Sequence, residues 1–209
     1  MAINSNVSQF LNKIKQGVKP NMYQVSVNWP SELDQGKGAT DKDLVNILCK
    51  SAALPASSLG VIEVPFRGRT VKIAGDRTFD TWSATFINHE DMRIRAYFEE
   101  WLAKINSHEN NASPLIRPQS SSQGYMANLS VAQLEKNATA GSAAGSTIRE
   151  YTLWHAFPTS VSQIDLAYDS NDQISEFSVE FQLSYWTAES KTAAESSPPG
   201  VKETVSVPS

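Results

Sequence analysis

The hydrophobic pattern of this chain predicts a mainly β protein with two helices. Residues 6–18 carry apolar side chains at helical spacing, and Asn6 with Gln9 resembles a capping box. Residues 89–106 carry a second apolar stripe, with Glu90 and Asp91 in the expected first turn and charged residues on the opposite face. The stripe consists of Ile94, Phe98, Trp101, Leu102 and Ile105. One amphipathic helix among many strands would close one side of a sheet core.

Alternating apolar and polar residues predict the strands. We expect them at 23–29, 44–49, 79–87, 125–134, 150–156, 161–168 and 177–185. Residues 59–73 predict a hairpin turning at Arg67-Gly68-Arg69, because Gly68 can supply the positive φ of a tight turn. We also expect a turn at Ala74-Gly75-Asp76-Arg77-Thr78 and a break at Phe157-Pro158.

These elements predict one domain, an antiparallel β-sandwich or partial barrel with a flanking helix and a short N-terminal helix. The domain is expected to span residues 1–186, with polar insertions near 31–43 and 107–147. Residues 187–209 have no aromatic side chain and are rich in Ser and Pro, so we expect a flexible tail.

The composition argues against several classes of protein. The 209 residues carry a formal charge of −4, and only 19% are charged, which argues against a basic nucleic-acid binder. No apolar run is long enough for a membrane helix, and the N-terminus does not resemble a signal peptide. Cys49 is the only cysteine, so an intrachain disulfide is excluded.

The sequence contains no recognisable catalytic or metal-binding motif. Walker, GxGxxG, HExxH, CxxC and GxSxG motifs are missing, and the three histidines are far apart. Asp169, Asn171 and Glu180 fit three positions of a calcium loop, but Ile174 stands where the loop needs glycine. A polar hairpin turn is the better interpretation. We expect no enzyme activity, no cofactor and no metal.

The last predicted strand has the longest alternation. Its apolar row should pack against the 89–106 helix and consists of Phe177, Val179, Phe181, Leu183 and Tyr185. Its polar row consists of Glu176, Ser178, Glu180, Gln182 and Ser184. In an ordinary sandwich the polar row faces water. In a ring-forming protein it could line a channel, where a lack of cations lets DNA phosphates slide. The pattern alone leaves both open.

Several motifs occur together in one order. They are Ala53-Leu54-Pro55, the stretch RTVKIAGDRTFDTW at 69–82, Phe157-Pro158-Thr159 and the terminal F-x-V-x-F-x-L-x-Y-W at 177–186. KPNMYQVSV at 19–27 precedes them, and the amphipathic helix follows the second. In this combination the chain resembles the major tail tube protein of contractile-tailed, T4-like bacteriophages.

The resemblance implies a structural subunit. Six copies are expected to join their sheets into a closed ring barrel, and the rings to stack into a tube inside the sheath, on the baseplate. The tube would conduct double-stranded DNA and the tape-measure protein. Implied partners are further copies, the sheath, the baseplate hub or initiator, the tape-measure protein and the tail terminator, with no membrane insertion. The expected location is the virion tail, assembled in the host cytoplasm.

The resemblance also suggests roles for residues. The hairpin 61–73 and strands 161–168 and 174–185 are candidates for the barrel wall. The lumen-facing candidates are Glu176, Ser178, Glu180, Gln182 and Ser184. The ring-stacking candidates lie in the ALP loop and the charged turns, and are Ala53, Leu54, Pro55, Arg67, Arg69, Asp76 and Arg77. The charged groups among them could equally be exposed turns of little energetic value.

Other functions remain open at this point. The nearest alternative is the inner tube of a type VI-like or other contractile injection system. A carbohydrate-binding β-sandwich would need an exposed aromatic platform, for which Tyr125 is the sole loop candidate, and an enzyme would need a convergent polar pocket. The stretches 31–43, 107–147 and 187–209 appear longer than in the tail tube family. They could be arms ordered on polymerisation or solvated spacers.

Overall fold

A computed structural model describes residues 7–14, 17–30, 33, 44–113, 124–135, 147–169, 171 and 173–190. Its helices are α1 (Val7–Ile14) and α4 (Arg93–Ile105). Its strands are β1 (Tyr23–Val27), β2 (Cys49–Ala52), β3 (Ser57–Phe66), β4 (Arg69–Phe79), β5 (Trp82–Ile87), β6 (Ala127–Leu134), β7 (Thr147–Val161), β8 (Glu176–Gln182) and β9 (Tyr185–Ser190). The predicted mainly β fold with a flanking helix and an N-terminal helix is confirmed.

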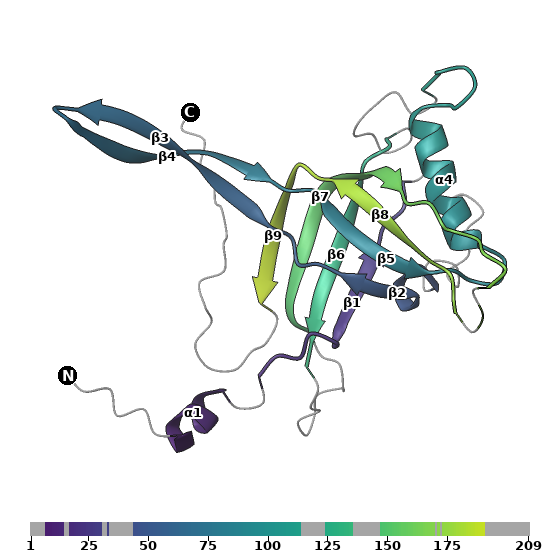
Figure 1. The fold of residues 1–209 in the computed structure, drawn as a ribbon, viewed down its shortest axis with the longest axis horizontal. Helices are drawn as coiled ribbons and strands as arrows, with labels where there is room; N and C mark the ends of the chain where they lie inside the picture. The colour runs from purple at the N-terminus through teal and green to yellow at the C-terminus, as the bar shows by residue number, and fades with distance from the viewer. Residues whose placement is uncertain are drawn as a thin grey trace.

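The long strand β7 belongs to both layers of a sandwich. Its first part pairs with β6 on one side and β9 on the other, and β1 extends this first layer beyond β6. Its last part pairs with β8, which is followed by β5 and β2 in the second layer. All these pairs are antiparallel, and Figure 1 shows the strands of the second layer crossing those of the first.

Two bends occur at the same level where the layers meet. His155 in β7 has a left-handed backbone with φ 53°, and its amide nitrogen donates to Asn128 Oδ1 at 3.3 Å. Opposite it, the chain passes from β8 to β9 through Leu183 and Ser184, and Ser184 N donates to Trp154 O at 3.1 Å. A residue inserted in the left-handed conformation bends a ladder, so β7 and its neighbour turn the corner together.

The core lies between the layers and is closed by α4. Ile94, Phe98 and Trp101 are buried on that helix, as the apolar stripe predicts. The Phe98 ring centroid lies 5.9 Å from that of Phe181 and 6.2 Å from that of Phe177. Each aromatic side chain of this kind contributes a large apolar area, so the helix and the second layer hold each other in place.

The start of α4 differs from the prediction. The helix begins at Arg93, and Glu90 and Asp91 lie in the turn before it rather than in its first turn. Met92 occupies the N-cap with φ 54° and gives no side-chain cap. Asp91 Oδ1 instead accepts the amide hydrogen of Arg93 at 3.2 Å, so a carboxylate still satisfies a free donor of the helix end.

Three local predictions were wrong. Residues 44–47 form a helical turn, with Leu48 N donating to Leu44 O at 2.9 Å, and the strand starts only at Cys49. The expected break at Phe157-Pro158 does not occur, because Pro158 lies at a register shift of β7, where its missing N–H is tolerated. The expected strand at 161–168 ends at Val161, and beyond it Leu166 and Tyr168 are fully or almost fully exposed.

The predicted boundaries also shift in two places. β4 continues through the expected turn at 74–78 as far as Phe79, so the hairpin is longer than predicted. Residues 187–190, placed in the tail, are part of strand β9, while 191–209 lie outside the described residues. Most of the 31–43 insertion is also outside them, but Leu33 is described and is buried in the core.

Candidate functional site

The outer surface of the second layer is a polar sheet face. On β8 the side chains of Phe177, Val179 and Phe181 are buried. The alternate residues therefore point to the other side, together with their partners across the β5–β8 ladder. We call this surface the polar face and define it as Lys50, Ser83, Thr85, Ser160, Glu176, Ser178, Glu180 and Gln182.

Hydrogen bonds and one ion pair connect the polar face. Lys50 Nζ lies 2.6 Å and 2.7 Å from the two carboxylate oxygens of Glu176. Glu180 Oε2 accepts from Ser160 Oγ at 3.1 Å, and the hydroxyls of Thr85 and Ser178 are 3.0 Å apart. Lys50 is the single cation of this face and is held by a carboxylate, so the surface presents hydroxyls and a small negative charge.

The polar face contains four of the five residues predicted to face a lumen. Glu176, Ser178, Glu180 and Gln182 lie along β8, whereas Ser184 lies beyond its end, at the bend. The same bend ends the apolar row, and Tyr185 is 39% exposed instead of packing inward as expected. Lys50, Ser83, Thr85 and Ser160 were not predicted. The alternation in TWSATFI carries a signal for two of them, but only the strand register brings them to β8.

The second surface is a long two-stranded arm formed by β3 and β4. Figure 1 shows it projecting from the sandwich, and it forms a separate sheet. Its turn is confirmed at Arg67 and Gly68, whose φ values of 45° and 80° fit the two-residue turn that suits the twist of hairpin strands. No residue of β3 or β4 is buried. The arm is therefore not part of the polar face.

The two sides of the arm differ in chemistry. One side carries the cross-strand pairs Ile62–Ile73, Val64–Val71 and Phe66–Arg69. We call its five apolar residues the arm's apolar face: Ile62, Val64, Phe66, Val71 and Ile73, each between 41% and 61% exposed. The other side includes the ion pair between Glu63 and Lys72, with Oε1 and Nζ 3.4 Å apart. An isolated two-stranded hairpin has only marginal stability in water. An exposed apolar patch of this kind is typical of a surface that contacts another protein.

Two glycines meet where the arm's register shifts. The shift lies between Leu59 and Val61, opposite an extra residue in β4. A Cβ on Gly75 would lie 3.2 Å from the carbonyl carbon and oxygen of Gly60 and 3.3 Å from Ile62 Cγ1. The strands can approach this closely only because both side chains are missing.

The predicted stacking residues do not form one cluster. Ala53, Leu54 and Pro55 lie between β2 and β3, at the root of the arm, where Ala53 O accepts from Trp82 Nε1 at 2.6 Å. Arg67 and Arg69 lie at its tip, and the Arg67 guanidinium is 5.4 Å from the centroid of the Phe66 ring. Asp76 and Arg77 lie in the root-side part of β4, which is a strand rather than a turn.

The third surface is helix α1. The predicted apolar repeat forms a stripe on one side, which we call the helix stripe: Val7, Phe10, Leu11 and Ile14, between 47% and 73% exposed. No residue of this helix is buried. Figure 1 shows it standing apart from the sandwich. An amphipathic helix of 8 residues gains little stability by itself, so its stripe lacks the packing that such a helix needs.

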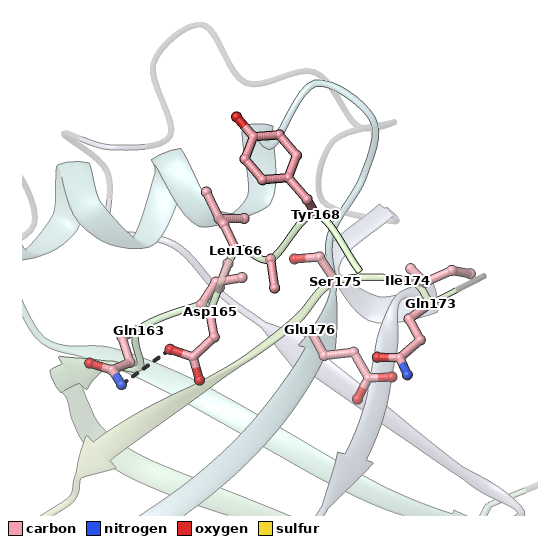
Figure 2. Close-up of a pocket in the computed structure, with 10 residues that line it drawn as sticks. Gln163, Asp165, Leu166, Tyr168, Gln173, Ile174, Ser175 and Glu176 are labelled. Carbon is pink, nitrogen blue, oxygen red and sulfur yellow. Dashed lines mark hydrogen bonds between the residues drawn. The ribbon is translucent and has the colours of Figure 1, made fainter. Parts of the chain in front are cut away.

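A shallow hollow lies in the loop between β7 and β8 (Figure 2). Its volume is about 780 Å³, and Gln163, Asp165, Leu166, Ile174 and Glu176 are among the lining residues. The ring of Tyr168 points away from the other labelled side chains.

Within the described residues no three His, Cys, Asp or Glu side chains gather as a metal site would require, and no helix is long and apolar enough to span a membrane.

Three titratable groups among the described residues have shifted pKa values, and burial raises the pKa of one of them, Tyr23. Burial raises the pKa of the Cys49 thiol to about 12, which keeps it protonated and unreactive. The hydrogen bond from the Arg93 side chain holds the pKa of Asp91 well below its usual range. Tyr23 Oη donates to Cys49 O at 3.0 Å, and Asp91 Oδ1 lies 2.7 Å from His89 Nδ1 in the exposed turn before α4, so the contacts of these groups hold local structure. The exposed aromatic platform of a carbohydrate binder is also not found at Tyr125, whose half-buried ring packs edge-on against Phe157.

These surfaces define a structural subunit that assembles with other protein chains. It has an extended polar sheet face with little charge, and two apolar surfaces that a lone globular protein would bury.

Comparison with known proteins identifies the family of this chain. The profile of the family described as phage tail tube protein matches residues 18–189. The chain is 30% identical to tail tube protein gp19 of Enterobacteria phage T4 over 168 residues, which are 80% of this chain and 90% of that protein. It is 25% identical to the tail tube protein of Serratia phage KSP90 over 179 residues, 84% and 93% of the two chains. The chain belongs to the phage tail tube protein family and is a structural subunit of the tube, a part of the virion tail.

Solved structures share the fold at low identity. One is a chain from the sheath/tube terminator of the extracellular contractile injection system PVC, with a TM-score of 0.55 and 14% identity, covering 83% of this chain and 96% of that one. Another is from the baseplate of the anti-feeding prophage, with a TM-score of 0.54 and 12% identity, covering 81% and 93%. The two curated phage relatives make a phage tail the better assignment than an injection system.

Proposed function

We propose that copies of this chain close into rings whose channel is lined by the polar face, and that stacked rings conduct DNA and the tape-measure protein. The chemistry of the polar face carries this proposal. A wall over which DNA slides must not hold phosphates, and each lysine or arginine that contacts a phosphate adds affinity. Here the single cation of the face, Lys50, is already paired with Glu176.

Several hydroxyl side chains of the polar face also suit a channel wall because they are short and are bonded to a neighbouring side chain. Thr85 with Ser178 and Ser160 with Glu180 satisfy one another across the strands. Side chains held in this way keep few free donors for a passing polymer. The proposed lumen residues are therefore Glu176, Ser178, Glu180 and Gln182, joined by Ser83 and Thr85.

The sheet edges offer the means of ring closure. β2 and the end of β7 bound the second layer, and their outer sides have no partner strand among the described residues. In a closed ring each such edge pairs with a neighbour, which removes a surface prone to unspecific association. We propose six subunits in a ring, which agrees with the 6-fold symmetrised baseplate that contains a chain of similar fold.

The arm is the proposed contact between successive rings. It extends away from the sandwich and carries an apolar face that needs a cover (Figure 1). The ALP loop at its root and the arginines at its tip would then contact a neighbour at different places. The sheath, the baseplate hub and the terminator are proposed as further partners, and assembly in the host cytoplasm as the route into the virion.

Site-specific labelling tests the channel wall. Ser178→Cys in a Cys49→Ala background places the only thiol on the polar face, and Glu109→Cys in the same background is the control on an exposed turn after α4. After assembly, maleimide-linked gold particles small enough to enter a channel are added to tubes with open ends. Electron microscopy should show gold along the tube axis for the first variant and on the outside for the control. Gold on the outer surface for Ser178→Cys would refute the lumen assignment.

A further inference from the structure

We infer that the helix stripe of one subunit packs on the arm's apolar face of another copy, so that α1 is the receptor for the arm. This inference rests on the proposed stacking of rings and names the two surfaces that meet. Both surfaces are uncovered in the single subunit, and each belongs to an element whose opposite side carries charged or polar residues. Contact between them would bury both apolar surfaces and leave those charged and polar residues in water.

The helix stripe has the spacing of a one-sided contact. Val7, Phe10, Leu11 and Ile14 repeat at intervals of three and four residues, which places them on one side of the helix. The other side is formed by polar residues that include Asn12 and Lys13. A helix with apolar residues on one side only can bury them against a single surface. That surface must be about as long as the stripe.

The arm's apolar face provides a surface of matching length. α1 has 8 residues and is about 12 Å long at about 1.5 Å per residue. The apolar face runs from Ile62 to Phe66 on β3, which is about 13 Å at about 3.3 Å per residue. Two paired strands lie about 4.8 Å apart, which is within the width of about 10–12 Å that a helix with its side chains covers. The other side of the arm carries the ion pair of Glu63 and Lys72 at its middle, and an apolar stripe packed there would take these charges out of water.

The positions of the two surfaces favour contact between different copies. In Figure 1 the arm leaves the upper part of the sandwich, whereas α1 lies below its lower end. The two surfaces are separated within one subunit in this view. Complementary surfaces at opposite ends of a subunit form a head-to-tail contact, which continues from copy to copy when it does not close on itself. Such a contact fits the stacking direction of a tube.

Disulfide trapping tests the contact. In a Cys49→Ala background, Leu11→Cys on one tagged chain and Val64→Cys on a differently tagged chain are mixed, assembled and oxidised. The heterodimer should form at least about ten times faster than with two matched controls. The first control combines Asn12→Cys, on the polar side of α1, with Val64→Cys. The second combines Leu11→Cys with Lys72→Cys, on the side of the arm opposite its apolar face.

Each outcome decides the inference. Tubes that form normally but give the same yield for all pairs would overturn the contact and leave the ring-and-tube function in place. A chain carrying both Leu11→Cys and Val64→Cys that closes internally when dilute and unassembled would show packing within one subunit, which also overturns it. A Cys49→Ala chain that stays a single subunit under all assembly conditions would contradict the contact and the proposed stacking alike.

Hydrogen exchange on the unsubstituted protein gives a second test, in case the cysteine variants do not assemble. Amides of residues 7–14 should exchange at least about a hundred times more slowly in tubes than in subunits, together with those of 62–73. Fast exchange of residues 7–14 in tubes whose arm is protected would overturn the inference, because the arm would then be covered by something else.

Discussion

Replacing Gly75 with alanine should weaken the arm while leaving the sandwich intact. The backbone of Gly75 lies outside the left-handed region, so alanine can adopt its conformation, and the effect comes from contact alone. The new Cβ would lie 3.2 Å from backbone atoms of Gly60 and 3.3 Å from Ile62 Cγ1. Distances this short force the two strands apart, since backbone atoms cannot rotate away as the end of a side chain can.

The expected magnitude follows from two opposing effects. Overpacking of this kind costs about 1–3 kcal/mol. Alanine reduces the freedom of the unfolded chain and returns about 0.4–1 kcal/mol. The net loss of about 1–2 kcal/mol falls on the arm, and it corresponds to a rise of about five- to thirty-fold in the concentration at which tubes form.

Sedimentation of tubes at graded protein concentration measures this threshold. Thr70→Ala, on the same strand but away from the register shift, serves as the matched control and should leave the threshold unchanged. Thermal unfolding of the dilute subunit should move little in either variant, because no residue of the arm is buried in the sandwich. A Gly75→Ala chain that assembles at the wild-type threshold would refute the reasoning about the glycine pair.

Three further predictions concern the sandwich and its helix. His155→Gly should be more stable than His155→Ala by about 1 kcal/mol in chemical unfolding, the reverse of the usual order, because the left-handed backbone at φ 53° favours glycine; the opposite order would contradict the proposed corner. Cys49 should resist iodoacetamide at pH 8 in the folded subunit and react after denaturation, because burial raises its pKa to about 12; rapid labelling of the folded protein would show an open edge. The lowered pKa of Asp91 means that its contribution to stability is present above the unfolded pKa of about 4 and is lost as the pH falls further, so the unfolding midpoints of the parent and Asp91→Asn should converge in acid; a constant difference from pH 7 to pH 2 would exclude this role.

The sequence predicted well those elements whose hydrophobic pattern matches the side that they bury in the core. Alternation in residues 82–87 and 176–182 predicted two strands whose buried sides face the same core. The apolar stripe predicted the three buried residues of α4, which are Ile94, Phe98 and Trp101. In each case the side chains that form the pattern also form the packing, so a local signal was sufficient.

The incorrect predictions concern segments whose conformation is decided by a partner. In the predicted strand 161–168 only the first two residues bond to β8, and from residue 163 on the segment pairs with no strand in the described part of the chain. Pro158 interrupts the pattern yet fits a register shift against β8. Gly75 suggested a turn, but the glycine opposite it, Gly60, makes it the meeting point of two strands. The sequence cannot show which residue lies opposite, and for the same reason it revealed only half of the polar face.

The bends at His155 and at Leu183–Ser184 have a mechanical consequence. Because β7 runs through both layers, and β8 with β9 follows it around the same corner, the layers are parts of one folded ribbon rather than two separate plates. Two plates held by apolar contact can slip past each other under shear. Here a force that pulls on one layer passes into the other through covalent backbone and its ladder of hydrogen bonds, so the wall of the subunit deforms as a single body.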